Sequence, residues 1–133
     1  MILLDTHVLV WRAADDSRVG KRATRKIDRA LADGEVAVSA FSFWEIAVLV
    51  NAGRLRLRAT PNDLRSAAMD AGVREIPVDG RVAILSTRLH GMHGDPADRI
   101  IVATALELGA TLATADRAIL AMKSGPLRID VST

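Results

Sequence analysis

The chain has 133 residues, half of them hydrophobic, with no cysteine and a formal net charge of +2. These values fit one folded domain over residues 1–133, and they exclude disulfide frameworks, thiolate zinc sites and cysteine nucleophiles. The longest apolar runs, such as residues 46–50, are far shorter than the ~20 residues of a bilayer span, so no membrane segment is expected.

The first half of the chain predicts two strands, each followed by helices. An apolar run at the N-terminus stops at Asp5, which is typical of a buried strand that presents an acid at its C-terminal end. Further along, Ser42 and Glu45 have the spacing of a capping box, so we expect a helix to begin at Ser42. The predicted elements are strands over 1–4 and 35–39 and helices over 8–13, 21–32 and 42–50.

A short basic stretch follows these elements. Residues 53–58 place arginine and leucine in alternation after a glycine, in a turn or a short extended piece. Three arginines on one side of such a piece can meet phosphates, although the same alternation is also typical of an exposed edge. The sequence leaves both interpretations open for Arg54, Arg56 and Arg58.

The second half continues the alternation and contains a well-marked helix start. Asp95 has the position of an N-cap, Pro96 the first helical position and Asp98 the third, where an acid suits the helix dipole. A short strand then ends just before Asp116. The predicted elements are strands over 73–77, 111–114 and 127–131 and helices over 61–71, 82–89, 96–108 and 117–122.

Strands that alternate with helices over the full length imply an α/β fold. The sheet is expected to be parallel and covered on both faces, with right-handed crossovers. The strand over 73–77 is less apolar than the others and is expected nearer the sheet edge. In the helix over 82–89, Ile84 and Leu85 are expected to face inward.

Four acids occupy corresponding places in these elements. Asp5 and Asp116 follow their strands directly, whereas Glu45 and Asp98 enter from neighbouring helix starts. Because ligands of open parallel sheets bind beyond the carboxyl ends of the strands, we expect the four carboxylates to converge. Structural alternatives stay open, since Asp98 and Asp116 can be helix caps and Glu45 a capping-box partner. His7 is either a ligand or an exposed histidine beside the strand end.

A convergence of four carboxylates requires a cation. Like charges ~4 Å apart repel by several kcal/mol at an effective dielectric near ~20, so something positive has to lie between them. Oxygen ligands alone favour Mg²⁺, with Mn²⁺ as its substitute, and the waters that such an ion retains can attack a phosphodiester bond. The hydroxyl neighbours that can hold the acids in register are Thr6, Ser39 and Thr114.

The remaining charges fit a polyanionic substrate. Without the four acids, 12 acidic residues stand against 18 lysines and arginines, which leaves the rest of the chain at +6 (18 − 12). A metal site that acts on nucleic acid requires such an acidic spot within a basic shell. Solvated helix faces explain many of the individual arginines equally well.

Four motifs carry these acids in order over essentially the whole chain. They are residues 5–7 (Asp-Thr-His), 42–46 (Ser-Phe-Trp-Glu-Ile), 93–99 (His-Gly-Asp-Pro-Ala-Asp-Arg) and 114–117 (Thr-Ala-Asp-Arg). Together they resemble PIN-domain proteins of the VapC toxin type. The resemblance implies a PIN-like three-layer α/β/α sandwich with a central five-stranded parallel sheet. It also implies a Mg²⁺- or Mn²⁺-dependent endoribonuclease that acts as the toxin of a type II toxin-antitoxin system.

The same resemblance implies partners and site residues. The partners are an RNA substrate, a VapB-like antitoxin and a second copy of the chain in a homodimer, in the bacterial cytoplasm. Carried over residue by residue, the acidic quartet of the family falls on Asp5, Glu45, Asp98 and Asp116. Three of them are expected to bind metal, and Glu45 to bind metal or to orient the attacking water. Asp95 is kept as a cap more than as a ligand.

Two other classes of protein remain open. A non-catalytic module can use a PIN-like fold and bound metal to grip RNA or a partner, and a cleavage assay with and without Mg²⁺ separates it from a nuclease. A receiver-like or phosphatase-like domain, with Asp5 as phosphoryl acceptor, is the least supported. Such a phosphatase needs a second aspartate at the position of His7, and a receiver needs a lysine after its last strand, yet none follows Ser124.

Overall fold

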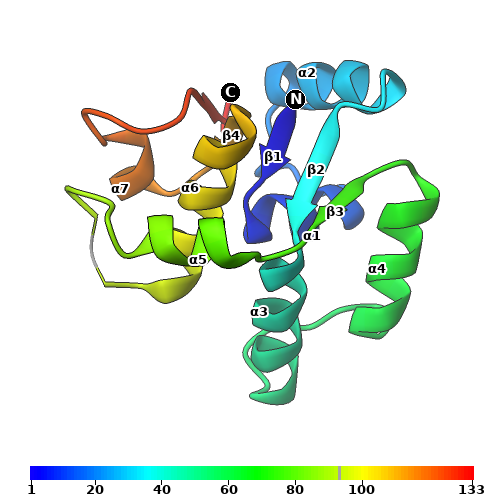
Figure 1. Cartoon of the computed structure of the whole chain (residues 1–133). Coiled ribbons are helices and arrows are strands. Elements are labelled where there is room, and N and C mark those ends of the chain that lie inside the picture. The colour runs from blue at the N-terminus through cyan, green and yellow to red at the C-terminus, as the bar shows by residue number, and fades with distance from the viewer. Residues whose placement is uncertain (93) are drawn as a thin grey trace.

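The structure, a computed structural model, describes residues 1–92 and 94–133. Within them, five strands form one sheet in the order β3-β2-β1-β4-β5, and all neighbouring strands are parallel (Figure 1). The strands are β1 (Ile2–Leu4), β2 (Val36–Ser39), β3 (Arg74–Ile76), β4 (Thr111–Thr114) and β5 (Arg128–Asp130). The predicted parallel sheet is confirmed, and the first strand of the chain lies at its centre.

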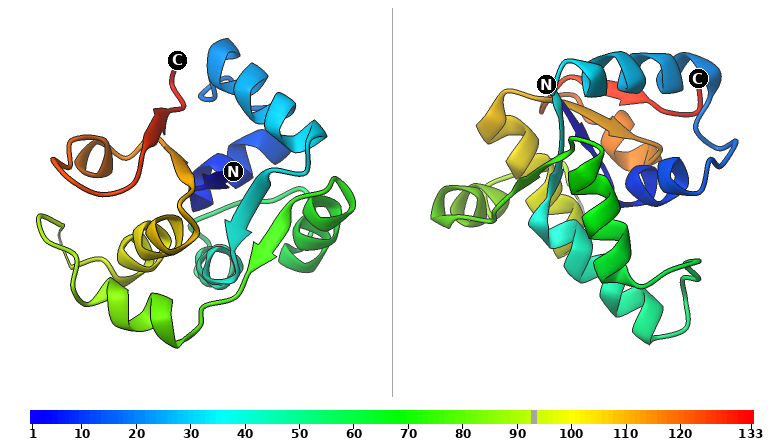
Figure 2. Two further views of the ribbon diagram at one scale, coloured as in Figure 1. Left: turned by 45° about the horizontal axis from the view of Figure 1, so that its top comes forward. Right: turned by 90° about the vertical axis from the view of Figure 1, so that its right-hand side faces the viewer.

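Seven helices of the described chain connect these strands. They are α1 (Thr6–Ala13), α2 (Lys21–Ala32), α3 (Ala40–Asn51), α4 (Pro61–Asp70), α5 (Gly80–Ser86), α6 (Pro96–Leu108) and α7 (Arg117–Leu120). Figure 2 shows α1, α2 and α4 on one face of the sheet and α5, α6 and α7 on the other, so the molecule has three layers. α3 leaves the carboxyl end of β2 and contacts α1, α4 and α6.

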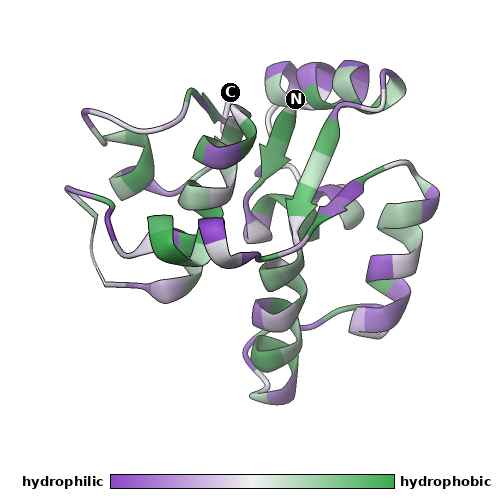
Figure 3. Ribbon diagram, viewed as in Figure 1, coloured by the Kyte–Doolittle hydropathy of each residue, from purple (hydrophilic) through white to green (hydrophobic). Residues whose placement is uncertain are grey.

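Strand side chains alternate between two hydrophobic cores, one on each face of the sheet. Leu4 and Val38 pack with Val8 of α1, whereas Leu3 belongs to the core that contains Ile101 of α6. Because both faces are covered, β1 is hydrophobic along its whole length, and so is β2 up to the buried Ser39 at its end (Figure 3). In the part of the chain that the structure describes, no helix is both long enough and apolar enough to cross a membrane.

The start of α3 differs from the prediction. The expected capping box at Ser42 is wrong, because the helix begins at Ala40 and its N-cap is Ser39. The Ser39 hydroxyl accepts a hydrogen bond from the Phe41 N–H (3.1 Å), as an N-cap should. β2 thus passes into α3 without a loop, and Ser42 lies inside the first turn with its side chain buried.

A second prediction, that Ile84 faces inward, is also wrong. Ile84 is 57% exposed, and Val82 is the buried residue of α5. The reason is that α5 packs mainly on α6 rather than on the sheet. Only the side chains on one narrow face of this short helix are therefore buried. The expectation for β3 is confirmed, because this strand forms one edge of the sheet.

Gly20 is required by a close approach of two backbone segments. It precedes α2, and its N–H donates to the Val131 carbonyl (2.7 Å) at the end of β5. A Cβ at this position would lie 2.3 Å from the backbone carbon of Thr133, which is a severe clash. The absence of a side chain therefore lets α2 dock against the segment that follows β5.

Candidate functional site

Four elements each bring one acid to a single pocket of about 380 Å³. Asp5 directly follows β1, and Asp116 follows β4, the neighbouring strand. Glu45 comes from α3, and Asp98 from the first turn of α6. We call this space, beyond the carboxyl ends of β1 and β4, the acid pocket. Its other lining residues are His7, Trp11, Asp95 and Ala115.

Asp5 is buried and held by two hydrogen bonds. One carboxylate oxygen accepts from the Thr6 N–H (2.8 Å) and the other from the Thr114 hydroxyl (2.7 Å). The Thr114 oxygen also accepts from the N–H of Asp116 (3.0 Å), so one hydroxyl links two of the four acids. Burial raises the pKa of Asp5, while the hydrogen bonds from Thr114 and Thr6 and the nearby His7 oppose that rise.

The pKa of Asp98 shows that the acids influence one another. Burial of its carboxyl, followed by the negative charges of four neighbouring acids, raises this pKa from 3.8 to about 7. The neighbours, in order of their effect, are Asp95, Asp5, Asp116 and Glu45. The Asp98 carboxyl therefore retains its proton to a higher pH than an ordinary aspartate does. A divalent cation in the acid pocket would oppose all of these effects and release that proton.

The donor set fits a hard cation by its chemistry, since the acids offer only carboxylate oxygens. Within residues 1–92 and 94–133, however, no group of three or more histidine, aspartate or glutamate side chains is arranged so that it could hold an ion as it stands. The carboxylates line a common space instead of closing around one point. An ion such as Mg²⁺, which keeps several of its own waters when proteins bind it, needs fewer direct protein ligands than such a group would supply. The four acids share one pocket as expected, and their roles as ligands remain a prediction.

Two acids of the pocket, Asp116 and Asp95, cap the N-terminus of a helix, which was the structural alternative to a role in metal binding. Asp116 accepts from the Ile119 N–H (3.0 Å), and Asp95 accepts from the Ala97 N–H (2.9 Å). Since a carboxylate has two oxygens, the cap that one oxygen of Asp116 forms does not exclude this acid as a metal ligand. The capping-box alternative for Glu45 is wrong, because this residue lies near the middle of α3.

The predicted supporting hydroxyls have different surroundings. Thr114 contacts Asp5 directly, whereas the Thr6 hydroxyl donates to the Ser42 hydroxyl (2.9 Å) and Ser39 caps α3. Thr6 and Ser42 are both buried, so their hydrogen bond joins α1 to the helix that carries Glu45. Sequence reasoning missed this role of Ser42. The available signal was a small polar residue at the start of an otherwise apolar helix.

Trp11 is a further residue of the acid pocket that the sequence did not single out. It lies one helical turn after the exposed His7 on α1, and the two ring centroids are 6.0 Å apart. Their spacing of four residues, which places side chains on one face of a helix, was the available signal. Both aromatic rings line the same pocket as the four acids.

Comparison with known proteins identifies the family of the chain. The profile of the PIN domain family matches residues 2–124. The chain belongs to the PIN-domain family. This confirms the family expected from the sequence and the three-layer architecture that the resemblance implied. This PIN domain brings its acids together from the segments that follow β1 and β4 and from the helices α3 and α6.

Individual relatives agree with this assignment. The PIN domain is 38% identical over 117 residues to Ribonuclease VapC22 of Mycobacterium tuberculosis, which covers 87% of each chain. It is 27% identical to a chain of FitAcB from Neisseria gonorrhoeae, with a TM-score of 0.60 over 89% of each chain. A chain of VapBC2 from Rickettsia felis, at 13% identity, shares the fold, with a TM-score of 0.72 over 97% of this chain and 98% of that one.

Proposed function

We propose that this PIN domain is a metal-dependent endoribonuclease and the toxin of a type II toxin-antitoxin system. The observation that carries the proposal is the acid pocket, in which burial and four neighbouring acids raise the pKa of Asp98 to about 7. A divalent cation is the simplest way to stabilise such a concentration of carboxylates. The 38% identity to a VapC ribonuclease supports RNA as the substrate.

In this proposal Asp5, Asp98 and Asp116 hold Mg²⁺ or Mn²⁺, and Glu45 holds the ion or orients the attacking water. A bound ion supplies an activated water and positive charge opposite the phosphate oxygens. The chain itself fixes the spacing of the carboxylates. The Thr114 hydroxyl does this for Asp5 and for the backbone that carries Asp116, as supporting residues of metal sites do.

The proposed partners follow from the same relatives. The VapC-type resemblance and solved structures of similar fold, VapBC2 among them, support a VapB-like antitoxin that binds and neutralises this toxin. We further propose that the toxin forms a homodimer and acts in the bacterial cytoplasm. A short reading frame immediately upstream of the gene is the candidate to look for, and its co-expression and co-purification with this chain would test the antitoxin assignment. The molar mass of the isolated protein tests the dimer.

The main test uses purified protein and a long synthetic RNA. We expect internal cleavage with Mg²⁺, none with EDTA, and a loss of about 100-fold or more in rate for Asp98→Asn, because the variant removes a metal-facing charge without changing shape. Asp70→Asn, which removes an exposed acid at the end of α4, is the control and should cleave as wild type does. RNA binding without cleavage in every condition would instead identify a non-catalytic module.

A further inference from the structure

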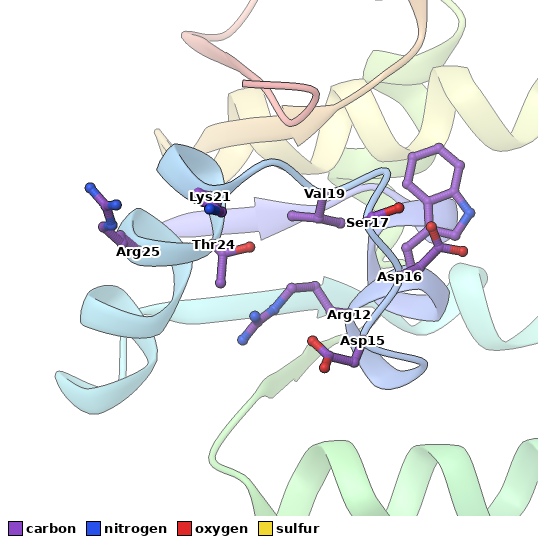
Figure 4. Close-up of a pocket in the computed structure, with 9 residues that line it drawn as sticks. Arg12, Asp15, Asp16, Ser17, Val19, Lys21, Thr24 and Arg25 are labelled. Atoms are coloured by element: carbon purple, nitrogen blue, oxygen red, sulfur yellow. The ribbon is translucent and has the colours of Figure 1, made fainter.

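A second pocket lies next to the acid pocket, and Trp11 lines both. Its volume is about 350 Å³, and it is formed by the end of α1, the loop over 14–20 and the start of α2. Figure 4 shows Lys21, Thr24 and Arg25 on the α2 side of this space and Arg12 and Asp15 on the opposite side. We call it the basic pocket.

Two of the five charged residues that line the basic pocket are paired, and the three that remain carry a net positive charge. Asp16 is bound by the Arg18 guanidinium (2.7 and 3.1 Å), and Arg12 forms an ion pair with Asp28. In the part of the chain that the structure describes, Lys21 and Arg25 have no ion-pair partner. Of the acids that line the pocket, Asp15 is left to oppose them.

The other basic residues of α2, the helix that carries Lys21 and Arg25, strengthen the positive field at the basic pocket. α2 contains five basic residues and one acid, which gives a net charge of +4 (5 − 1) over Lys21–Ala32. Its basic residues are Lys21, Arg22, Arg25, Lys26 and Arg29. A helix of this charge attracts polyanions along its length, and a pocket at its start can select one anionic group.

Trp11 forms a fixed wall between the two pockets. The Arg18 guanidinium lies 4.5 Å from the centre of its ring, in a cation–π contact, and Asp16 holds that guanidinium in place. The loop over 14–20 is thereby tied to α1. The distance between the two pockets is therefore set by packed side chains and not by a free loop.

We propose that the basic pocket binds a phosphate of the RNA substrate other than the one that is cleaved. This inference rests on the proposed ribonuclease function. A single strand that places one phosphate in the acid pocket continues past Trp11, where Lys21 offers a point charge and Arg25 a planar fork to a phosphate group. Contacts of this kind position a nucleic acid and carry no sequence information.

The test compares two double variants of α2 with the same change in charge. Lys21→Ala/Arg25→Ala removes the two cations of the basic pocket, whereas Arg22→Ala/Lys26→Ala removes one arginine and one lysine that are exposed on the same helix and do not line it. RNA affinity is measured by fluorescence anisotropy in EDTA, so that binding is seen without cleavage. Cleavage is then measured in Mg²⁺ over a range of RNA concentrations.

For Lys21→Ala/Arg25→Ala, the pocket pair, we expect RNA to bind about 10-fold more weakly. The slope of the logarithm of the binding constant against the logarithm of the salt concentration should become shallower by about 0.7, the value for one lost phosphate contact. The loss in cleavage should fall on KM more than on kcat, because the pocket holds substrate away from the reacting atoms. The control pair should bind RNA within about 2-fold of wild type, since only the general field of α2 is reduced.

A neutral methylphosphonate moved along the RNA one phosphate at a time locates the contact. We expect one position, beside the cleavage site, to weaken wild-type binding and to have no further effect in Lys21→Ala/Arg25→Ala. Equal losses for the two variant pairs, or an effect of the pocket pair on binding of the purified antitoxin and not of RNA, would overturn the proposal. RNA binding that depends on this pocket in a protein that never cleaves would refute the nuclease function alone.

Discussion

The acid pocket has two sides that differ in how they are held. On the strand side, Asp5 is buried and bonded to Thr114, which also binds the backbone of Asp116. On the helix side, Glu45 and Asp98 come from α3 and α6 and are only partly buried. Hydrogen bonds therefore set the geometry of the strand side. On the helix side, burial and then the negative charges of the neighbouring acids raise the pKa of Asp98. Removing a hydrogen bond on the strand side should therefore lower the stability of the metal-free protein, whereas removing a negative charge on the helix side should raise it.

Thr114→Val is the largest expected disruption of the strand side. The variant keeps the shape of the side chain but leaves an oxygen of the buried Asp5 without its hydrogen bond, which costs about 1–3 kcal/mol of unfolding free energy. We expect a lower melting temperature and metal affinity reduced by about 10- to 100-fold. Calorimetric Mg²⁺ titration and thermal unfolding measure the two effects.

Thr111→Val serves as its control. This residue begins the same strand, is less buried, and lies at the opposite end from the acid pocket. It should bind Mg²⁺ with wild-type affinity. If both valine variants lose affinity to the same extent, the hydroxyl of Thr114 has no special role in holding Asp5.

Asp98→Asn tests the helix side, because it removes the carboxyl whose pKa is raised. The raised pKa of Asp98 means that the folded protein holds a proton which the unfolded chain, with a pKa near 3.8, releases. This contribution to stability is complete below ~3.8 and is lost as the pH rises through about 7. In EDTA, the melting temperature of wild type should therefore fall between about pH 5 and about pH 8 more than that of Asp98→Asn.

At the upper end of that range the metal-free variant should be the more stable protein, by a few degrees. Added Mg²⁺ should raise the melting temperature of wild type and have little effect on the variant, because a ligand stabilises only the state that binds it. Parallel pH curves for the two proteins would show that the Asp98 carboxyl is not crowded as described. Asp70→Asn should follow the wild-type curve.

Ser42→Ala should have the smallest effect of these variants. It tests the hydrogen bond between Ser42 of α3 and Thr6 of α1, which supports the helix that carries Glu45. Losing the hydrogen bond between the buried hydroxyls of Ser42 and Thr6 should lower the unfolding free energy by about 1 kcal/mol, or roughly 4 °C in melting temperature. Because this contact joins α1 to α3, RNA cleavage should fall slightly through displacement of Glu45. Ser66→Ala, an exposed serine of α4, should change neither quantity.

The sequence predicted the strands and the acids that follow them well, because buried parallel strands are continuous apolar runs with acids directly behind them. β4 and α2 have the predicted bounds, and the four acids share a pocket since the carboxyl ends of β1 and β4 are neighbours. The start of α3 could not be predicted, because Ser39 and Ser42 both suit a helix start and only the length of β2 decides between them. The exposure of Ile84 was equally inaccessible, since it depends on which element α5 packs against.

The position of β1 at the centre of the sheet has a consequence for synthesis of the protein. Asp5 is made well before its partner Thr114, which lies 109 positions later on a strand that pairs directly with β1. A growing chain on the ribosome cannot complete the carboxylate arrangement until β4 has emerged. A chain that stops before β4 therefore lacks both Asp116 and the hydroxyl that holds Asp5, so the nuclease proposed above would be assembled only after most of the domain has been made.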